Sequence, residues 1–333
     1  MESNIIQTKR VGFKYKKNLA EGHFSEFGLE IKCLIFQSID DLNLIIYSGE
    51  NKSIVCYDIN NNQKVNEVLH AHEKEISYLN HYSEKKNRIN LMLSISGKDN
   101  NLKVWNVSNF QCLYNFTKIN SQGWINCACF LNDNDQIYVL STNSIGFSKK
   151  PNPIKVFDLN GKSIMDINNS NYNTYFIDVY YDNKSSTKYI ITGNIRFSES
   201  YNYNKNTVYH RYYNKDIKIV PNSIIKEGDT VELIQLSQDG NIRIWNFHTA
   251  DLLKTINVGF KDLYNICLWD NDYLLVCCSD RIKIINLNKE QNTSESNLEN
   301  KGLIRIGKVV HSQYGKCLIL QTTNGFMLWE SEN

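Results

Sequence analysis

The sequence contains very little proline, with only three prolines among its 333 residues. Proline has no backbone N–H to donate to a strand ladder, so a chain with this little of it can form long uninterrupted strands. Tyrosine and phenylalanine, which favour strands, are abundant at 20 and 14 residues. Hydrophobic residues make up 41% of the chain, which supplies enough core material to exclude a disordered protein. The composition therefore favours a folded, strand-rich protein.

Long apolar runs and an excess of one charge are also missing. No stretch of about 18 apolar residues occurs, and the N-terminal residues lack the apolar centre of a signal peptide. The 37 basic and 35 acidic residues give a net charge of +2. This balance argues against a dedicated nucleic-acid or membrane-surface protein. We expect a soluble protein without a membrane partner or a nucleic-acid partner, and nothing in the sequence indicates a homo-oligomer.

The nine cysteines lack the spacing of a disulfide framework or of a zinc site. No Cys-x-x-Cys pair occurs, and most of the cysteines lie in apolar runs, where a free thiol behaves as a small hydrophobic side chain. Free thiols persist in reducing compartments, so we expect an intracellular protein of the cytoplasm or nucleus.

Motifs for catalysis, nucleotide binding and metal binding are absent as well. The sequence has no HExxH and no GxSxG, and Gly97-Lys98 lacks the upstream glycine and the following hydroxyl of a phosphate-binding loop. His70 and His72 could share a metal, but no third ligand is evident nearby, and a turn with one structural histidine explains the pair. We therefore expect no catalytic residue, no cofactor and no metal. A site assembled from distant loops would leave no such motif.

The chain does contain a repeat. Seven times, a short apolar run ends in an aromatic or apolar residue followed by an acidic or amide residue. The pairs are separated by 48, 52, 44, 44, 40 and 44 residues, and they are Tyr57-Asp58, Trp105-Asn106, Phe157-Asp158, Tyr201-Asn202, Trp245-Asn246, Ile285-Asn286 and Trp329-Glu330. A period of roughly 40 to 45 residues is the length of one four-stranded propeller blade.

The second and fifth repeats show the strands most clearly. In the second, apolar runs at 76–82, 90–96, 102–107 and 112–117 are separated by polar turn residues. In the fifth, runs at 231–236 and 242–247 flank Ser237-Gln238-Asp239-Gly240, and Asp-Gly before an alternating run is a strong hairpin signal. Short strands with a turn every 8–12 residues or so are typical of an all-β meander.

The segment from Ser237 to Asn246, with Asp239 six residues before Trp245, resembles the repeat of the WD40 family. His72, Asp99 and Trp105 have the corresponding spacing in the second repeat. The resemblance extends over the chain at low similarity and is sharp in these two repeats only. It implies a propeller in which His72, a strand hydroxyl (Ser94, or alternatively Ser96), Asp99 and Trp105 form a hydrogen-bonded tetrad. Repeats without the tetrad should then rest on apolar packing alone.

The two ends of the chain complement each other in this scheme. Trp329 lies four residues from the last residue, so the final repeat lacks a fourth strand, while residues 10–16 near the N-terminus read as an unassigned strand. We predict a single seven-bladed propeller over 1–333 whose last blade is closed by an N-terminal strand within 1–22. The expected blades cover approximately 23–70, 71–118, 119–168, 169–214, 215–258, 259–300 and 301–333. We expect a loop excursion over 288–301.

WD40 propellers typically bind peptides or protein domains on the face around the central channel. The resemblance therefore implies a non-catalytic interaction scaffold, a subunit of a larger complex whose partners are other proteins or peptides. The positions that correspond to the family's partner-facing residues are Glu75, Ser77, Lys98, Trp124, Asn126 and Gln238. Trp124 is the strongest of these because aromatic residues are common interface anchors, although it could also pack under a loop. The alternative is a propeller enzyme or small-ligand binder with polar groups at the channel mouth.

Overall fold

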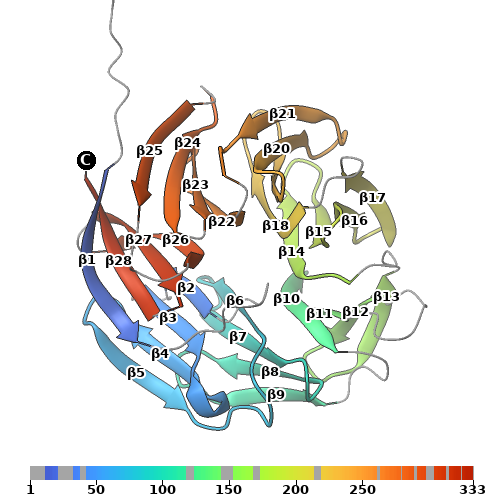
Figure 1. Ribbon diagram of the computed structural model, residues 1–333. Coiled ribbons are helices and arrows are strands. Elements are labelled where there is room, and N and C mark those ends of the chain that lie inside the picture. Colours follow the sequence, from blue (N-terminus) through green and yellow to red (C-terminus); the bar gives the residue numbers. More distant parts are fainter. Residues whose placement is uncertain are drawn as a thin grey trace, which may run out of the picture. The chain divides into compact units, whose positions relative to one another are not determined.

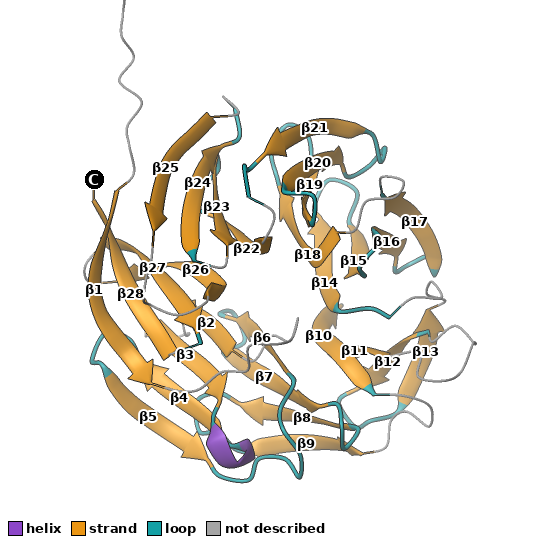
Figure 2. Cartoon of the chain, in the orientation of Figure 1, coloured by secondary structure: helices purple, strands orange, loops and turns teal. Residues whose placement is uncertain are grey.

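The computed structural model describes residues 12–21, 33–37, 43–117, 124–143, 153–167, 173–213, 219–260, 263–278, 280–288, 291–297, 304–312, 315–323 and 325–332. These residues form an all-β propeller of four-stranded antiparallel blades (Figures 1 and 2). One 3-10 helix, at Glu50–Lys52, is the sole helical element among them. The chain divides into two compact units.

One unit consists of Gly28–Pro221 and Phe247–Asp251. Each of its sheets contains four consecutive strands in chain order. The strands are β2 (Cys33–Gln37), β3 (Asn43–Ser48), β4 (Ile54–Asp58) and β5 (Gln63–Val68); β6 (Tyr78–Glu84), β7 (Ile89–Ser96), β8 (Asn101–Asn106) and β9 (Cys112–Thr117); β10 (Ile125–Asp133), β11 (Gln136–Asn143), β12 (Ile154–Asp158) and β13 (Ser163–Ile167); and β14 (Phe176–Asp182), β15 (Thr187–Gly193), β16 (Ser198–Asn202) and β17 (Thr207–Tyr212).

The other unit consists of Met1–Phe27, Asn222–Asn246 and Leu252–Asn333. It contains, apart from the first residues of β18, the strands β18 (Ile219–Lys226), β19 (Glu232–Ser237), β20 (Asn241–Asn246) and β21 (Leu252–Asn257); β22 (Leu263–Leu268), β23 (Tyr273–Cys278), β24 (Arg281–Asn286) and β25 (Gln291–Asn297); and β26 (Ile304–Ser312), β27 (Gly315–Thr322), β28 (Gly325–Glu332) and β1 (Gly12–Glu21).

The first strand of the chain pairs with the last. The order of this sheet is β1-β28-β27-β26, and β1 runs antiparallel to β28 with Tyr15 opposite Trp329 and Phe13 opposite Ser331. The N-terminal strand therefore supplies the fourth strand that the final repeat lacks.

Aspartate, asparagine and glycine shape the turns between strands. Asp99 Oδ1 accepts a hydrogen bond from the backbone N–H of Asn101 at 2.9 Å, and Asp239 Oδ1 accepts one from Asn241 at 3.2 Å. Between them in each turn, Asn100 (φ 57°) and Gly240 (φ 85°) adopt the left-handed conformation that these residue types tolerate best. The contacts of this Asp-x-Asn spacing therefore lie within one turn and involve no other repeat.

The prediction of a loop over 288–301 was wrong. That segment contains β25, which pairs antiparallel with β24 over Gln291–Asn297. Its Asn, Ser and Glu residues lack the apolar alternation by which an inner strand is recognised, and an outer strand of a blade does not need it.

The core of each unit is made of apolar side chains from the faces of the sheets. In the Gly28–Pro221 unit, Val104, Ile125 and Val156 are fully or almost fully buried in one cluster, and Trp105 packs with Ile76 and Met92 in another. In the other unit, Trp329 packs with Ile284 and Leu318. Within the ranges described above, no helix has the length and apolar character needed to cross a bilayer.

Candidate functional site

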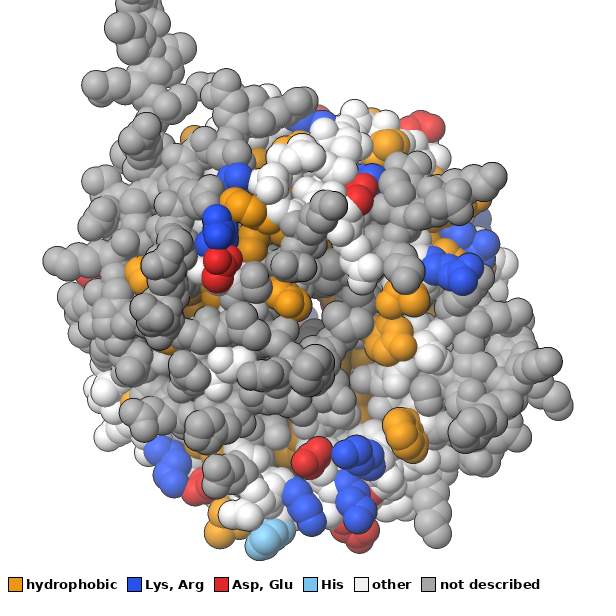
Figure 3. Space-filling view, viewed as in Figure 1, with side chains coloured by type: hydrophobic (Ala, Val, Ile, Leu, Met, Phe, Trp, Pro, Cys, Tyr) orange, Lys and Arg blue, Asp and Glu red, His pale blue; other side chains and the backbone are white. Residues whose placement is uncertain are grey.

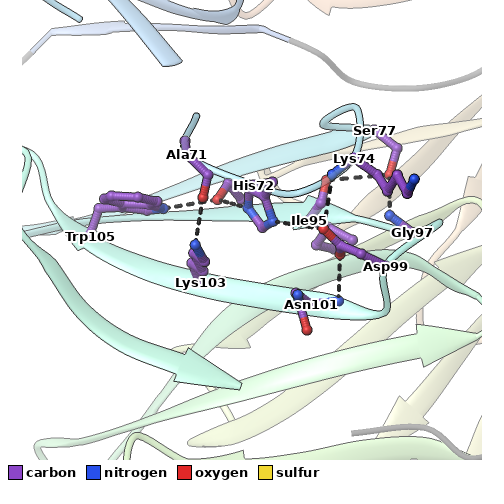
Figure 4. Close-up of polar contacts among 11 residues, drawn as sticks. Ala71, His72, Lys74, Ser77, Ile95, Gly97, Asp99, Asn101, Lys103 and Trp105 are labelled. Carbon is purple, nitrogen blue, oxygen red and sulfur yellow. Dashed lines mark hydrogen bonds and ion pairs between the residues drawn. The ribbon is translucent and has the colours of Figure 1, made fainter. Parts of the chain in front are cut away.

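The β6–β9 sheet brings His72, Ser94, Asp99 and Trp105 together (Figure 4). The indole Nε1 of Trp105 donates to Ser94 Oγ at 2.8 Å, and His72 Nε2 lies 2.7 Å from the same oxygen. Asp99 Oδ2 is 3.8 Å from His72 Nδ1, which is longer than a hydrogen bond. Ser94 is therefore the centre of the cluster, and the aspartate acts on the imidazole through its charge.

Burial lowers the pKa of His72 to about 4, against the opposing effect of the Asp99 carboxylate. The imidazole is thus neutral near pH 7. Because the Ser94 oxygen already accepts from Trp105, its own proton can be donated to His72 Nε2, which leaves the Nδ1 proton facing Asp99. The Ser94 hydroxyl thereby partners both the buried imidazole and the buried indole.

Asp99 and Ser77 also fasten the segment before β6 to the β7–β8 turn. Asp99 Oδ2 accepts from the backbone N–H of Lys74 at 3.2 Å. Ser77 Oγ accepts from the N–H of Gly97 at 3.2 Å and donates to the carbonyl of Ile95 at 3.4 Å (Figure 4). Ser77, expected as a partner-facing residue, is therefore occupied in holding this turn.

The remaining repeat-signature residues lie inside the blades or cap their turns. Tyr57, Phe157, Trp245 and Trp329 are buried. Asp58 Oδ1 accepts from the N–H of Asn60 at 2.8 Å, and Asp158 Oδ1 accepts from that of Lys162 at 2.8 Å. Asp239 pairs with Arg243, and this ion pair and its hydrogen bonds lower the pKa of the carboxyl against the opposing effect of burial. These contacts hold the blades and their turns together.

The prediction that repeats without the tetrad rest on apolar packing alone was wrong. In the β14–β17 sheet, the buried carboxylate of Glu199 accepts from Tyr201 Oη at 2.6 Å and from Arg211 Nε at 2.8 Å. In the β18–β21 sheet, Trp245 Nε1 donates to Gln235 Oε1 at 2.6 Å, so a glutamine replaces the serine of the tetrad. A buried polar group must find a partner whatever its type, and different side chains meet that requirement in different blades.

The candidate partner-facing residues divide into two groups. Trp124, directly before β10, keeps 60% of its side chain exposed, and it lies beside the β7–β8 turn, since a Cβ added to Gly97 would stand 3.7 Å from the Trp124 Cβ. The exposed Lys98 and Glu75 form an ion pair at 3.4 Å on that turn and the segment before β6. We call Glu75, Lys98 and Trp124 the Trp124 surface.

Asn126 and Gln238 are not part of the Trp124 surface. The Asn126 amide donates to the carbonyl of Thr174 at 3.0 Å and so links β10 to the segment before β14. Gln238 is exposed in the β19–β20 turn and belongs to the other unit. On the face drawn in Figure 3, acidic and basic side chains lie next to one another in small groups, and hydrophobic side chains are exposed elsewhere on the same face.

Within the part of the chain that the structure describes, no group of three or more His, Cys, Asp or Glu side chains is arranged to hold a metal ion. No protein-family model matches the sequence, and the comparison with curated proteins finds no significant match.

Proposed function

We propose that this protein is a non-catalytic WD40-type scaffold that binds another protein or peptide through the Trp124 surface, as a subunit of a larger intracellular complex. In the same proposal, the blades close into a seven-bladed ring in which β1 completes the blade of β26–β28. The antiparallel pairing of β1 with β28 supports this closure, because it covers the edge that β28 would otherwise leave unpaired.

The exposure of Trp124 carries the functional proposal. The other four tryptophans, Trp105, Trp245, Trp269 and Trp329, are all 4–8% exposed, whereas Trp124 is 60% exposed. Burying a tryptophan side chain is among the largest hydrophobic gains available to a chain, so one left on the surface fits a group that a partner covers. Tryptophan is also enriched among the residues that dominate binding energy.

The neighbouring charges suit such an interface. Lys98 and Glu75 are 63% and 73% exposed, and a pair this exposed stabilises the free protein by at most about 1 kcal/mol. It can therefore separate at little cost and pair with charges on a partner. An aromatic anchor beside exposed charges of both signs gives a protein-binding surface an apolar centre and a polar rim.

The test uses Trp124→Ala with Tyr213→Ala as its control, since Tyr213 is similarly exposed at 54% and lies outside the Trp124 surface. Partners are first identified by affinity purification with the wild-type chain and then reconstituted with purified proteins. We expect Trp124→Ala to weaken the binary complex at least about 30-fold, as for an interface residue worth about 2 kcal/mol, and Tyr213→Ala to leave it unchanged.

Thermal melting separates binding from folding. An exposed side chain contributes little to stability, so both variants should melt within a few degrees of the wild type. A fall of many degrees for Trp124→Ala, or a complex that survives this substitution with full affinity, would refute the assignment.

A further inference from the structure

A cavity of about 550 Å³ opens in the Gly28–Pro221 unit, at the end of β6, β10 and β14 opposite to Trp124. These three strands are neighbours in the propeller (Figure 1). Trp124 precedes the first residue of β10, whereas the cavity is lined by the middle and later residues of the three strands, by the turn after β10 and by Lys188 on β15. A space of this size is typical of small-ligand and peptide-binding sites.

The lining combines aromatic rings with acidic and amide side chains. The aromatic part comes from Tyr82, Phe130 and Tyr181. The rings of Tyr82 and Phe130 lie 5.9 Å apart, and the Tyr82 hydroxyl accepts from Asn132 Nδ2 at 2.8 Å, so this wall is held in place by the fold. Tyr181 is 45% exposed, so a ligand can reach part of this side chain.

The charge of the lining is negative. Asp135 and Asp178 contribute two carboxylates, and both side chains are exposed. Lys188 contributes the single ammonium group, and its charge is matched by an ion pair with Asp133, which lies outside the lining. His81 adds no positive charge near neutral pH, because burial lowers the pKa of its imidazole.

The field of Asp178 reaches the cavity wall. Burial, with a further contribution from the Asp178 charge, raises the pKa of the Cys129 thiol well above its usual value. The same ring that lines the opening already meets a cation, since Lys188 Nζ lies 5.9 Å from the centroid of Tyr181. The wall thus presents negative potential and aromatic faces together.

We propose that this cavity binds an organic cation, an ammonium or guanidinium group on an apolar stem. The charged head pairs with Asp178 and Asp135, and the stem lies against Tyr181, Phe130 and Val179. Such a group is carried either by a small amine or by a lysine or arginine side chain of a protein segment. The site involves none of the residues of the Trp124 surface and is independent of it.

The probes are acetyl-Gly-Gly-Lys-Gly-Gly-amide, the same peptide with norleucine in place of lysine, n-pentylammonium and pentanoate, each measured with the full-length chain by saturation-transfer NMR and calorimetry. We expect saturable binding of either cation. The norleucine peptide and pentanoate should bind at least about tenfold more weakly, because they cannot form the charge-assisted hydrogen bond to a carboxylate. Tighter binding of the lysine peptide than of pentylammonium assigns the site to a protein side chain, and the reverse order assigns it to a small amine. Equal binding of cation, neutral isostere and anion, or no saturable cation binding at all, overturns the proposal.

Two substitutions locate the binding. Asp178→Asn should weaken the cation at least about tenfold, while Asp229→Asn, an exposed carboxylate in the other unit, should have no effect. Tyr181→Ala should weaken it about two- to fivefold through the loss of one exposed cation–π contact, against Tyr213→Ala as the aromatic control. If Asp178→Asn lowers the melting temperature, Tyr181→Ala carries the test. Cation binding that is unchanged in both cavity variants, or that is lost in Trp124→Ala, places the ligand elsewhere and refutes this site.

Discussion

Replacing Ser94 by alanine removes one oxygen on which two buried side chains depend. Ser94 is fully buried, and its Oγ accepts from Trp105 Nε1 at 2.8 Å and lies 2.7 Å from His72 Nε2. The change removes a single oxygen atom, so the cavity that it leaves is small. Its main effect is to leave a buried indole N–H and a buried imidazole nitrogen without a hydrogen-bond partner.

Each of these two groups costs about 1–3 kcal/mol when it is buried without a partner, so Ser94→Ala should lower the free energy of unfolding by about 2–6 kcal/mol. Such a loss is a large part of the total stability of an ordinary domain, about 5–15 kcal/mol. With a urea dependence of about 3 kcal/mol per molar, the midpoint of urea unfolding moves down by about 1 M. Tryptophan fluorescence and circular dichroism report the transition.

Ser96→Ala is the matched control. Ser96 is two residues further along β7, on the same face and equally buried, but its Oγ has no hydrogen-bond partner among the residues that the structure describes. Removing an unsatisfied buried hydroxyl should leave stability within about 0.5 kcal/mol or increase it. Equal losses in the two variants, or a larger loss for Ser96→Ala, would refute the central role of Ser94.

Three further perturbations test the same framework. The pKa of His72 in the folded state, about 4, lies below the ordinary value of 6.5, so the unfolded state binds more protons between these two values. The free energy of unfolding, measured by urea titration, should therefore fall as the pH drops from about 6.5 towards 4. His72→Gln should flatten this pH dependence. Trp105→Ala should cost roughly 3–5 kcal/mol by denaturant unfolding, since a buried indole is replaced by a methyl group, and a near-neutral result would contradict the repeat register. Deletion of 1–21 removes β1 and leaves the β28 edge unpaired, so the melting temperature should fall and light scattering should rise; an unchanged melting curve would show that the β1–β28 pairing contributes nothing.

Much of the fold was readable from local patterns. Asp99 and Asp239 each stand two residues before an asparagine whose N–H they bond, and each stands six residues before a buried tryptophan. Both relations lie within one hairpin, so they follow from strand alternation and turn chemistry without knowledge of other repeats. The strands of the weaker repeats followed from the period rather than from their own residues.

The polar interior was less predictable. Glu199 stands in an ordinary strand, and neither its burial nor its bonds to Tyr201 and Arg211 can be inferred from the β16 sequence. Gln235 in β19 likewise gave no sign that it would accept from Trp245. A buried polar side chain is recognised only when its partner is known, and Arg211 and Trp245 lie on the strands next to those of Glu199 and Gln235.

The candidate binding surfaces also combine residues that could be named from the sequence with contacts that only the structure shows. The family resemblance implied the positions Glu75, Lys98 and Trp124 as candidates, whereas the exposure of Trp124 and the pairing of Lys98 with Glu75 come from the structure. The bond from Asn126 to the Thr174 carbonyl joins residues 48 positions apart, and no local motif predicts it. The cavity beside Tyr181 gathers residues from β6, β10, β14 and β15, so it has no continuous sequence pattern.

The sequence by itself determined the repeat, the strand and turn order within each blade, and the residues that cap those turns, because all of these depend on neighbours a few positions away. The tertiary structure alone decided between Ser94 and Ser96. Residues two apart on a strand share one face, so alternation treats them alike, and only the approach of His72, 22 residues earlier, selects the hydroxyl that is bonded. Tertiary packing also decided which tryptophan stays in solvent and which carboxylates meet at the cavity, since both depend on strands that the chain brings together only when neighbouring blades assemble.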